Sequence, residues 1–262
     1  VMGLFDGADP VTFEGSSADL AHRLGLPVVL VVDGAGVGGS VAATVLGHAR
    51  LWPDLKLAGV ILNRLGGEGH FQLQKAAIQA HTDVPVLGWA PERPEIRIPE
   101  RRLGLHQPHE LPGLDETLDR LGQELSKTLD LEALADLARP VPGRPFVETA
   151  RPGDLPVALG RDEAFSFCYA DTLDRLERLG VRWVPFSPLR ERLPEGVAGL
   201  YLPGGYPELH AATFAANRAL HADLRRAHGA GLPILAECGG YLALGETLVD
   251  LEGCAHPMAG VI

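Results

Sequence analysis

The sequence is poor in cysteine and in basic residues, and it has no long hydrophobic run. Its 3 cysteines are too few for a disulfide framework and fit no zinc-ligand spacing, so we expect free thiols in a reducing, cytoplasmic compartment. Acidic residues (34) exceed basic ones (23), and the net charge of −11 argues against nucleic-acid binding and docking on anionic lipid. The longest apolar stretch, Leu26 to Val32, is far shorter than the ~20 residues that span a bilayer.

The 262 residues also lack the Walker pattern of a phosphate-binding loop, Gly-x-x-x-x-Gly-Lys-Ser/Thr. A glycine-rich segment, Gly34 to Ser40, comes nearest, but Ser40 stands where the lysine would be. Backbone N–H groups at the start of a helix can bind phosphate. A tight strand-to-helix turn would require the same glycines. Both interpretations stay open.

Short apolar runs alternate regularly with longer helical patterns. The runs are almost continuously apolar, which is typical of parallel strands covered on both faces, and the alternation predicts a doubly wound α/β fold. The predicted strands are Pro27–Asp33, Leu57–Asn63, Pro85–Trp89, Leu155–Leu159, Val181–Phe186, Val197–Pro203 and Leu232–Glu237, with Gly260–Ile262 as a further extended run. The predicted helices are Val41–Trp52, Phe71–His81, Leu114–Leu137, Tyr169–Leu179 and Glu208–Ala230.

A proline-rich stretch separates two halves of the chain. Residues 139–153 contain 4 prolines and 2 glycines, which no helix crosses easily. We therefore predict a linker there, a first domain at 1–138 and a second at 154–262. Because the chain starts without Met and ends on an apolar run, we expect it to be a fragment of a longer protein.

The strongest candidate site is the segment Ala236-Glu-Cys-Gly-Gly-Tyr241. A cysteine between a buried strand and two glycines that open a helix is typical of a nucleophile elbow, and a helix N-terminus favours the thiolate. The alternative is a buried structural cysteine. Cys168 and Cys254 lack this context, and we predict that both are packing residues.

A second strand ends in Leu202-Pro-Gly-Gly-Tyr-Pro-Glu208. Paired glycines can turn backbone N–H groups toward a neighbouring strand end, as an oxyanion hole requires. An ordinary Pro-Gly loop is the alternative. Together with Cys238, the glycine pair predicts a nucleophile that faces backbone donors.

These two motifs resemble the glutaminase domain of class I glutamine amidotransferases. Four further phrases narrow the resemblance to the cobyrinate a,c-diamide synthase family. They are Gly160-Arg-Asp-Glu-Ala-Phe-Ser-Phe-Cys-Tyr169, Phe186-Ser-Pro-Leu189, Val1-Met-Gly-Leu-Phe-Asp-Gly7 and Pro99-Glu-Arg-Arg-Leu-Gly-Leu105. The resemblance covers essentially the whole chain. It implies a dethiobiotin-synthetase-like P-loop amidoligase domain followed by a flavodoxin-like glutaminase domain.

The resemblance also implies an activity. The amidoligase half would use MgATP to phosphorylate the a- and c-acetate carboxylates of cobyrinate or hydrogenobyrinate, and ammonia from glutamine would convert them to amides in cobalamin biosynthesis. ATP and Mg²⁺ are the implied cofactors, and glutamine and a corrinoid carboxylic acid are the implied partners. Neither nucleic acid nor a membrane is expected as a partner, and a homodimer is one assembly left open.

In the glutaminase half, the resemblance makes Cys238 the nucleophile that forms a thioester, with Gly205 and Gly239 at the oxyanion hole. The family's catalytic histidine lies well downstream of the elbow. His256 falls in a phrase that has no catalytic role in the family. The family's P-loop lies upstream of these residues, so we expect the 262 residues alone to show neither glutamine-dependent amidation nor ordinary glutaminase rates.

In the amidoligase half, the resemblance places Asp6 near the metal and the reacting carboxylate, where hard oxygen ligands suit Mg²⁺. It places Asn63 at the adenine edge, where an amide offers both a donor and an acceptor. Arg101 and Arg102 would bind corrinoid carboxylates, although the family usually has histidine where Arg102 stands. The alternatives are a turn for Asp6, a strand-end cap for Asn63 and a solvated charge cluster for the arginines.

Other functions remain open alongside this one. The substrate could be Ni-sirohydrochlorin, a tetrapyrrole acid amidated at the same two positions by a related enzyme. The chain could be a P-loop regulatory or partition-type ATPase without glutaminase activity, or an esterase-like hydrolase that uses the cysteine elbow. Covalent labelling of Cys238 by a glutamine analogue would separate the amidotransferase from the regulatory ATPase.

Overall fold

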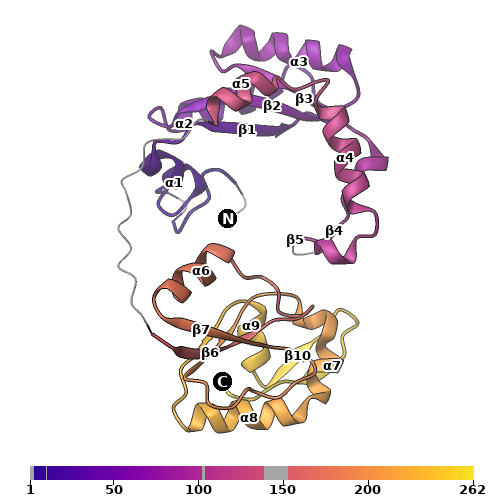
Figure 1. The fold of residues 1–262 in the computed structure, drawn as a ribbon. Coiled ribbons are helices and arrows are strands. Elements are labelled where there is room, and N and C mark those ends of the chain that lie inside the picture. Colours follow the sequence, from indigo (N-terminus) through magenta and orange to yellow (C-terminus); the bar gives the residue numbers. More distant parts are fainter. Residues whose placement is uncertain (1–2, 10, 102–103, 139–152) are drawn as a thin grey trace. The chain divides into compact units, whose positions relative to one another are not determined.

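The computed structural model describes residues 3–9, 11–101, 104–138 and 153–262, and it divides the chain into two compact units, Val1–Arg144 and Pro145–Ile262 (Figure 1). Each unit has its own parallel sheet, so the predicted α/β class with parallel sheets is confirmed. The predicted linker lies outside the described residues except for Gly153. The domain limits 1–138 and 154–262 therefore stay a prediction.

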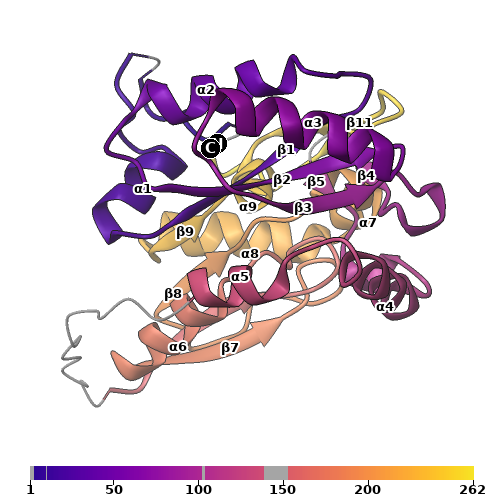
Figure 2. The same cartoon turned by 90° about the horizontal axis from the view of Figure 1, so that it is seen from above.

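The first unit is built on a three-stranded parallel sheet in the order β1-β2-β3. Its strands and first helices are α1 (Ser17–Leu24), β1 (Val28–Asp33), α2 (Val41–Leu51), β2 (Leu57–Leu65), α3 (Glu68–His81) and β3 (Val86–Pro91). Helices α2 and α3 cover one face of this sheet (Figure 2), and Val45, Leu62 and Ile78 are fully buried between them and the strands. The register pairs Asp33 with Asn63 at the carboxyl end of the sheet.

The rest of the first unit contains short elements and two further helices. They are η1 (Pro94–Ile96), β4 (Glu100–Arg101), β5 (Gly104–Leu105), η2 (Pro108–Glu110), α4 (Leu114–Leu125) and α5 (Leu131–Leu137). The predicted single helix Leu114–Leu137 is wrong, because the chain leaves the helix to run beside β3. There the Asp130 N–H donates to the Leu87 carbonyl (2.8 Å). Gly88 lies so close to this segment that a β-carbon on it would be 2.2 Å from the Thr128 oxygen.

The second unit is built on a four-stranded parallel sheet in the order β7-β6-β8-β9. Its strands are β6 (Leu155–Gly160), β7 (Val181–Phe186), β8 (Gly199–Leu202) and β9 (Ile234–Ala236), and its helices include α6 (Ala170–Arg178) and α9 (Gly239–Leu244). The core contains Phe165, Leu202 and Phe214, all with no exposed surface. Each predicted strand from Pro27–Asp33 to Leu232–Glu237 is present, with ends shifted by at most a few residues.

The predicted helix Glu208–Ala230 is wrong as one element, because it is divided at Asn217. It consists of η3 (Pro207–His210), α7 (Ala211–Ala216) and α8 (Arg218–Gly229). The Asn217 side chain accepts from the Leu220 N–H (3.2 Å) and so caps α8. Its amide nitrogen donates to the carbonyls of Pro188 and Glu191 (3.0 and 2.8 Å), which fixes the break against a neighbouring loop.

Two further predictions need correction near the C-terminal end of the unit. Gly260–Ile262 is not a strand, because these residues donate to the carbonyls of Leu244 and Gly245 instead of joining a sheet. A hairpin that the sequence analysis missed, β10 (Thr247–Val249) with β11 (Ala255–Pro257), precedes them. Cys254 directly precedes β11 and is exposed, so the prediction that it is a packing residue is wrong.

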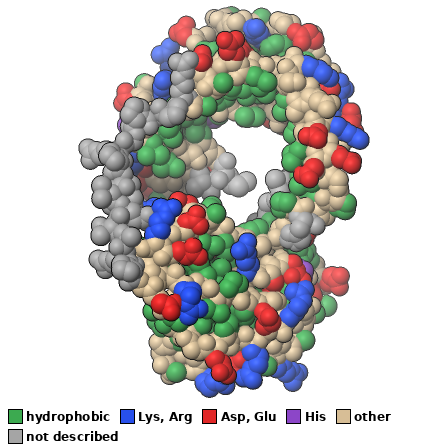
Figure 3. All heavy atoms as spheres, viewed as in Figure 1, with side chains coloured by type: hydrophobic (Ala, Val, Ile, Leu, Met, Phe, Trp, Pro, Cys, Tyr) green, Lys and Arg blue, Asp and Glu red, His purple; other side chains and the backbone are tan. Residues whose placement is uncertain are grey.

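Burial of the strands on both faces is also less complete than predicted. In β1, Val31 has 60% of its surface exposed, and in β9 Leu235 has 57% exposed. Hydrophobic side chains accordingly reach the surface of both units (Figure 3). Continuous apolar runs therefore predicted the strands correctly but overstated how fully they are covered.

Candidate active site

Cys238 forms the sharp connection between β9 and α9. Its φ of 49° and ψ of −112° lie in a region that side-chain-bearing residues rarely adopt, and its side chain is exposed. Such strain persists only where the surrounding structure enforces it, and it is the backbone geometry of a nucleophile elbow. The elbow expected from the sequence is thus seen in the backbone itself.

Close packing against the end of β8 enforces this turn. The Glu237 N–H donates to the Leu202 carbonyl (3.1 Å), and the Gly240 N–H donates to the Glu237 carbonyl (2.8 Å). A β-carbon on Gly240 would lie 2.1 Å from the Leu202 oxygen, which no real side chain tolerates. The second glycine after Cys238 is therefore required by a backbone contact.

The glycine pair after β8 lies directly beside the elbow. A β-carbon on Gly204 would be 3.5 Å from the Cys238 β-carbon, and one on Gly239 would be 3.1 Å from the Gly205 nitrogen. In the described part of the chain, the N–H groups of Gly205 and Gly239 have no hydrogen-bond partner. The structure thus brings Cys238, Gly205 and Gly239 together, and unpartnered backbone donors next to a nucleophile can stabilise an oxyanion.

An acidic residue precedes the nucleophile. Tyr201 donates from its hydroxyl to Glu237 Oε2 (2.5 Å). Burial, together with the hydrogen bond to this carboxylate, raises the pKa of Tyr201, so the phenol stays protonated at neutral pH. Burial also raises the pKa of the nearby thiol of Cys168, which keeps it protonated and less reactive than an activated cysteine.

No hydrogen bond joins Cys238 to a histidine among the residues that the structure describes. His256 instead places Nε2 2.7 Å from Asp250 Oδ2, and this pair closes the β10–β11 hairpin. The candidate site therefore contains an exposed thiol beside two unpartnered backbone N–H groups, and His256 bonds within the hairpin.

In the first unit, polar residues gather at the carboxyl ends of the strands. Asn63 and Arg64 line a cavity of about 440 Å³ together with residues that follow β3. Asn63 Oδ1 accepts from the Arg64 N–H (3.0 Å), and the Arg64 guanidinium bonds Asp33 (2.9 Å) and approaches Glu92 (3.7 Å). In open α/β sheets, ligands bind at this end of the strands.

The structure says less about the other predicted site residues of this unit, Asp6, Arg101 and Arg102. Asp6 is exposed, and its Oδ2 accepts from the Gly3 N–H (2.6 Å), which closes a local turn. The backbone of Arg101 lies in β4, and Arg102 lies outside the described residues. The structure does not bring Asp6 into a cluster, since no group of three or more His, Cys, Asp or Glu residues is arranged to hold a metal among the described residues.

The glycine-rich segment after β1 is held from the inside. Gln74, which is fully buried, donates from Nε2 to the carbonyls of Gly34 and Val37 (2.8 and 2.7 Å), and His70 Nε2 lies 2.6 Å from the Val37 oxygen. Two side chains of α3 thus account for a tight turn here. Direct phosphate contact stays a prediction.

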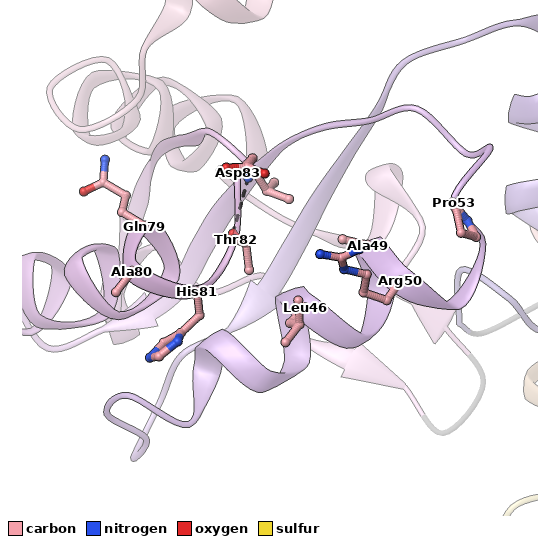
Figure 4. Close-up of a pocket in the computed structure, with 10 residues that line it drawn as sticks. Leu46, Ala49, Arg50, Pro53, Gln79, Ala80, His81, Thr82 and Asp83 are labelled. Atoms are coloured by element: carbon pink, nitrogen blue, oxygen red, sulfur yellow. Dashed lines mark hydrogen bonds between the residues drawn. The ribbon is translucent and has the colours of Figure 1, made fainter.

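A further cavity of about 490 Å³ lies between the C-terminal ends of α2 and α3 (Figure 4). The Arg50 side chain extends from α2 toward Thr82, and His81 and Asp83 are also in the lining. This cavity is at the amino ends of β2 and β3, opposite the strand ends where Asn63 lies.

Within the described residues, no helix has the length and apolar character that a bilayer span requires.

Comparison with known protein families assigns each unit. Residues 156–262 match the CobB/CobQ-like glutamine amidotransferase domain, and residues 1–100 match an AAA domain, which implies ATP binding. The cysteine elbow and the glycine pair both lie within the first of these matches.

Several curated relatives match all of this chain. It is 40% identical over 266 residues to the cobyrinate a,c-diamide synthase of Caldanaerobacter subterraneus subsp. tengcongensis and 45% identical over 269 residues to that of Salmonella typhimurium. It is 46% identical over 267 residues to the hydrogenobyrinate a,c-diamide synthase of Rhodobacter capsulatus. The chain spans 58% of the length of the first two relatives and 60% of the third.

Proposed function

We propose, from the premise that this chain is a homologue of the cobyrinate and hydrogenobyrinate a,c-diamide synthases, that it belongs to an enzyme that amidates a corrinoid acid with ammonia from glutamine. The observation that carries the proposal is the strained backbone of Cys238 beside two unpartnered glycine N–H groups. An exposed thiol at such an elbow suits acyl transfer.

The glutaminase half would proceed through a thioester. The Cys238 sulfur adds to the side-chain amide carbon of glutamine, and the N–H groups of Gly205 and Gly239 stabilise the negative oxygen that forms. Ammonia leaves, and water then hydrolyses the thioester to glutamate through a second oxyanion at the same donors. The thiol must stay reduced for this reaction, which suits a cytoplasmic location.

The amidoligase half would activate the acceptor carboxylate. The match to an AAA domain and the cavity beside Asn63 support ATP binding, with the Asn63 amide at the adenine edge. Phosphorylation of an acetate carboxylate gives an acyl phosphate, which ammonia converts to the amide. Mg²⁺ in nucleotide sites is held by only one or two carboxylates besides phosphate oxygens, and the exposed carboxylate of Asp6 is proposed as one of them. Arg101 and Arg102 are proposed to bind carboxylates of the corrinoid.

The substrate is proposed to be cobyrinate or hydrogenobyrinate. Relatives with both printed names are similar to this chain to nearly the same degree, 45% and 46% identity. The AAA match and the cysteine elbow would also suit the regulatory ATPase and the esterase-like hydrolase that the sequence left open, but the match of residues 156–262 favours the amidotransferase.

The nucleophile can be tested with a chloroketone analogue of glutamine and the complete reading frame that contains these residues. We expect mass spectrometry to find the label on Cys238. Cys238→Ser should abolish amidation with glutamine and retain amidation with free ammonium, because only the ammonia supply is lost. Cys254→Ser, which removes another exposed cysteine, is the matched control and should change neither rate. Glutamine-dependent amidation that survives Cys238→Ser would refute the proposal.

A further inference from the structure

The loop that follows β6 runs against the glycine pair of the candidate oxyanion hole. We propose that Asp162, at the start of this loop, is a positioning residue that fixes the orientation of the Gly204–Gly205 peptide and thereby aims the Gly205 N–H at the oxyanion. The inference rests on the proposed glutaminase function, since it assigns to Asp162 a task in supporting that site.

A backbone hydrogen bond holds the Gly204–Gly205 peptide. The Phe167 N–H donates to the Gly204 carbonyl (3.0 Å) in an isolated antiparallel bridge. The described residues contain no cis peptide bond, and in a trans peptide the carbonyl and the following N–H point in opposite directions. Holding the Gly204 carbonyl toward Phe167 therefore turns the Gly205 N–H away from Phe167. A flipped peptide would present a carbonyl oxygen where the donor is needed.

The loop after β6 also lies in close backbone contact with Gly205. A β-carbon on Gly205 would lie 2.0 Å from the Ala164 oxygen and 3.2 Å from the Phe165 α-carbon. Gly205 also has a φ of +157°, which disfavours any residue with a side chain. The Ala164–Phe167 segment is thus in backbone contact with both members of the glycine pair, and a shift of this segment moves the pair.

The carboxylate of Asp162 holds this segment in place. Asp162 Oδ1 accepts from the N–H groups of Ala164 (3.0 Å) and Phe165 (3.2 Å). Asp162 Oδ2 accepts from the Ser187 hydroxyl (2.8 Å) and the Leu189 N–H (2.9 Å). The first pair shapes the loop, and the second ties it to the segment after β7. Four accepted hydrogen bonds make this half-buried side chain the joint between two loops.

Other contacts keep the loop folded without Asp162. Phe165 is fully buried, with its ring 5.8 Å from that of Phe214. Arg190 forms an ion pair with Glu163, and its hydrogen bond lowers the pKa of Glu163 to about 2, so the pair is intact at neutral pH. In a variant of Asp162, the loop should therefore stay folded but shift its position against Gly205.

The decisive variant is Asp162→Asn in the complete reading frame. Asparagine can still accept from Ala164 and Phe165 through its oxygen. Its nitrogen, however, cannot accept from the Leu189 N–H, and it can bond Ser187 only if that hydroxyl turns to accept. We expect kcat for glutamine hydrolysis to fall by about tenfold or more, approaching the loss caused by removing one oxyanion donor, with KM within about twofold.

Two reagents separate positioning from general damage. A chloroketone analogue of glutamine develops negative charge on its carbonyl oxygen as the Cys238 thiolate adds, whereas iodoacetamide alkylates the thiolate by displacement without an oxyanion. Asp162→Asn should slow labelling of Cys238 by the chloroketone at least tenfold and leave labelling by iodoacetamide within about twofold.

Asp223→Asn is the matched control, because Asp223 is a buried aspartate of the second unit that, among the described residues, bonds only Arg192 and Arg226. It should lower stability and leave the ratio of the two labelling rates unchanged. Equal ratios in wild type and Asp162→Asn, or an equal loss in both aspartate variants, would overturn the inference. A wild-type protein that neither hydrolyses glutamine nor reacts with the chloroketone would refute the proposed function itself, and the inference with it.

Discussion

Two non-glycine residues in the described part of the chain have a positive φ, Arg64 (59°) and Cys238 (49°). Arg64 lies in the last two residues of β2, and Cys238 lies two residues after the end of β9. Such conformations cost about 1–3 kcal/mol each and cluster at functional sites. At Cys238 the backbone contact of Gly240 imposes the strain. At Arg64 the bond to Asp33 accompanies it. Local strain thus marks both candidate sites independently of any motif.

Single residues differ in how far the sequence reveals them. Cys238 was predictable, because its neighbours in the chain, an apolar strand and two glycines, create the elbow. Asp162 was not singled out, since its partners Ser187 and Leu189 lie more than twenty residues away along the chain. A side chain that acts through distant contacts leaves no local pattern. The signals that existed were an Asp shortly after a predicted strand and its place in the phrase Gly160–Tyr169, which carries the family resemblance.

Asp223 provides a prediction of pH dependence. It is 3% exposed, and hydrogen bonds from Arg192 first, and also from Arg226, hold the pKa of its carboxyl below the ordinary 3.8. A pKa that is lowered by folding stabilises the folded protein above pH 3.8, and this contribution disappears as pH falls through the lower folded value. Asp223→Asn should therefore reduce the free energy of unfolding by about 1–3 kcal/mol at pH 7. Urea unfolding between pH 7 and pH 3 checks this, and a deficit that stays constant down to pH 3 would contradict it.

Elements were predictable where the signal is local. Parallel strands show as apolar runs, and every one of the predicted ranges from Pro27–Asp33 to Leu232–Glu237 contains a strand. The break between α4 and α5 was not predictable, because it depends on hydrogen bonds to β3. Helix α1 was missed although its signals were present: Ser16 caps its start by accepting from the Asp19 N–H, and Gly25 ends it in a left-handed conformation.

The contact between β3 and the α4–α5 connection gives a prediction at this scale. Gly88→Ala should destabilise the first unit by a few kcal/mol, about 1–3 of them from its φ of +130°, and the rest because the new β-carbon would meet the Thr128 oxygen at 2.2 Å. Gly122→Ala, within α4 and with no atom near its new β-carbon, should be neutral or stabilise by about 0.5–1 kcal/mol. Thermal unfolding and hydrogen exchange at Asp130 measure both effects. Equal stability of the two variants would show that the connection does not depend on this close approach.

At the scale of the whole molecule, the motifs placed the chain among its relatives but did not distinguish between the two acids in the names of those relatives. The phrases spread from Val1–Gly7 to Ala236–Tyr241 pointed to the relatives that match all of this chain, of whose own length it spans 58–60%. Relatives named for cobyrinate and for hydrogenobyrinate are similar to this chain to nearly the same degree, with 45% and 46% identity. Pairwise similarity at this level therefore does not choose between the two acids of the proposed function.

The two hydrophobic cores share no residue, which leads to a prediction about cooperativity. Leu62 is fully buried in the core of the first unit, and Leu202 is fully buried in that of the second. Leu62→Ala should lower the stability of the first unit by about 2–5 kcal/mol, and Leu202→Ala should do the same for the second, because each leaves a cavity in one core only. Hydrogen exchange resolved along the chain should show faster exchange in β1 to β3 for the first variant and in β6 to β9 for the second. If either variant accelerates exchange equally in both sheets, the units unfold as one, and the separation of the cores has no thermodynamic consequence.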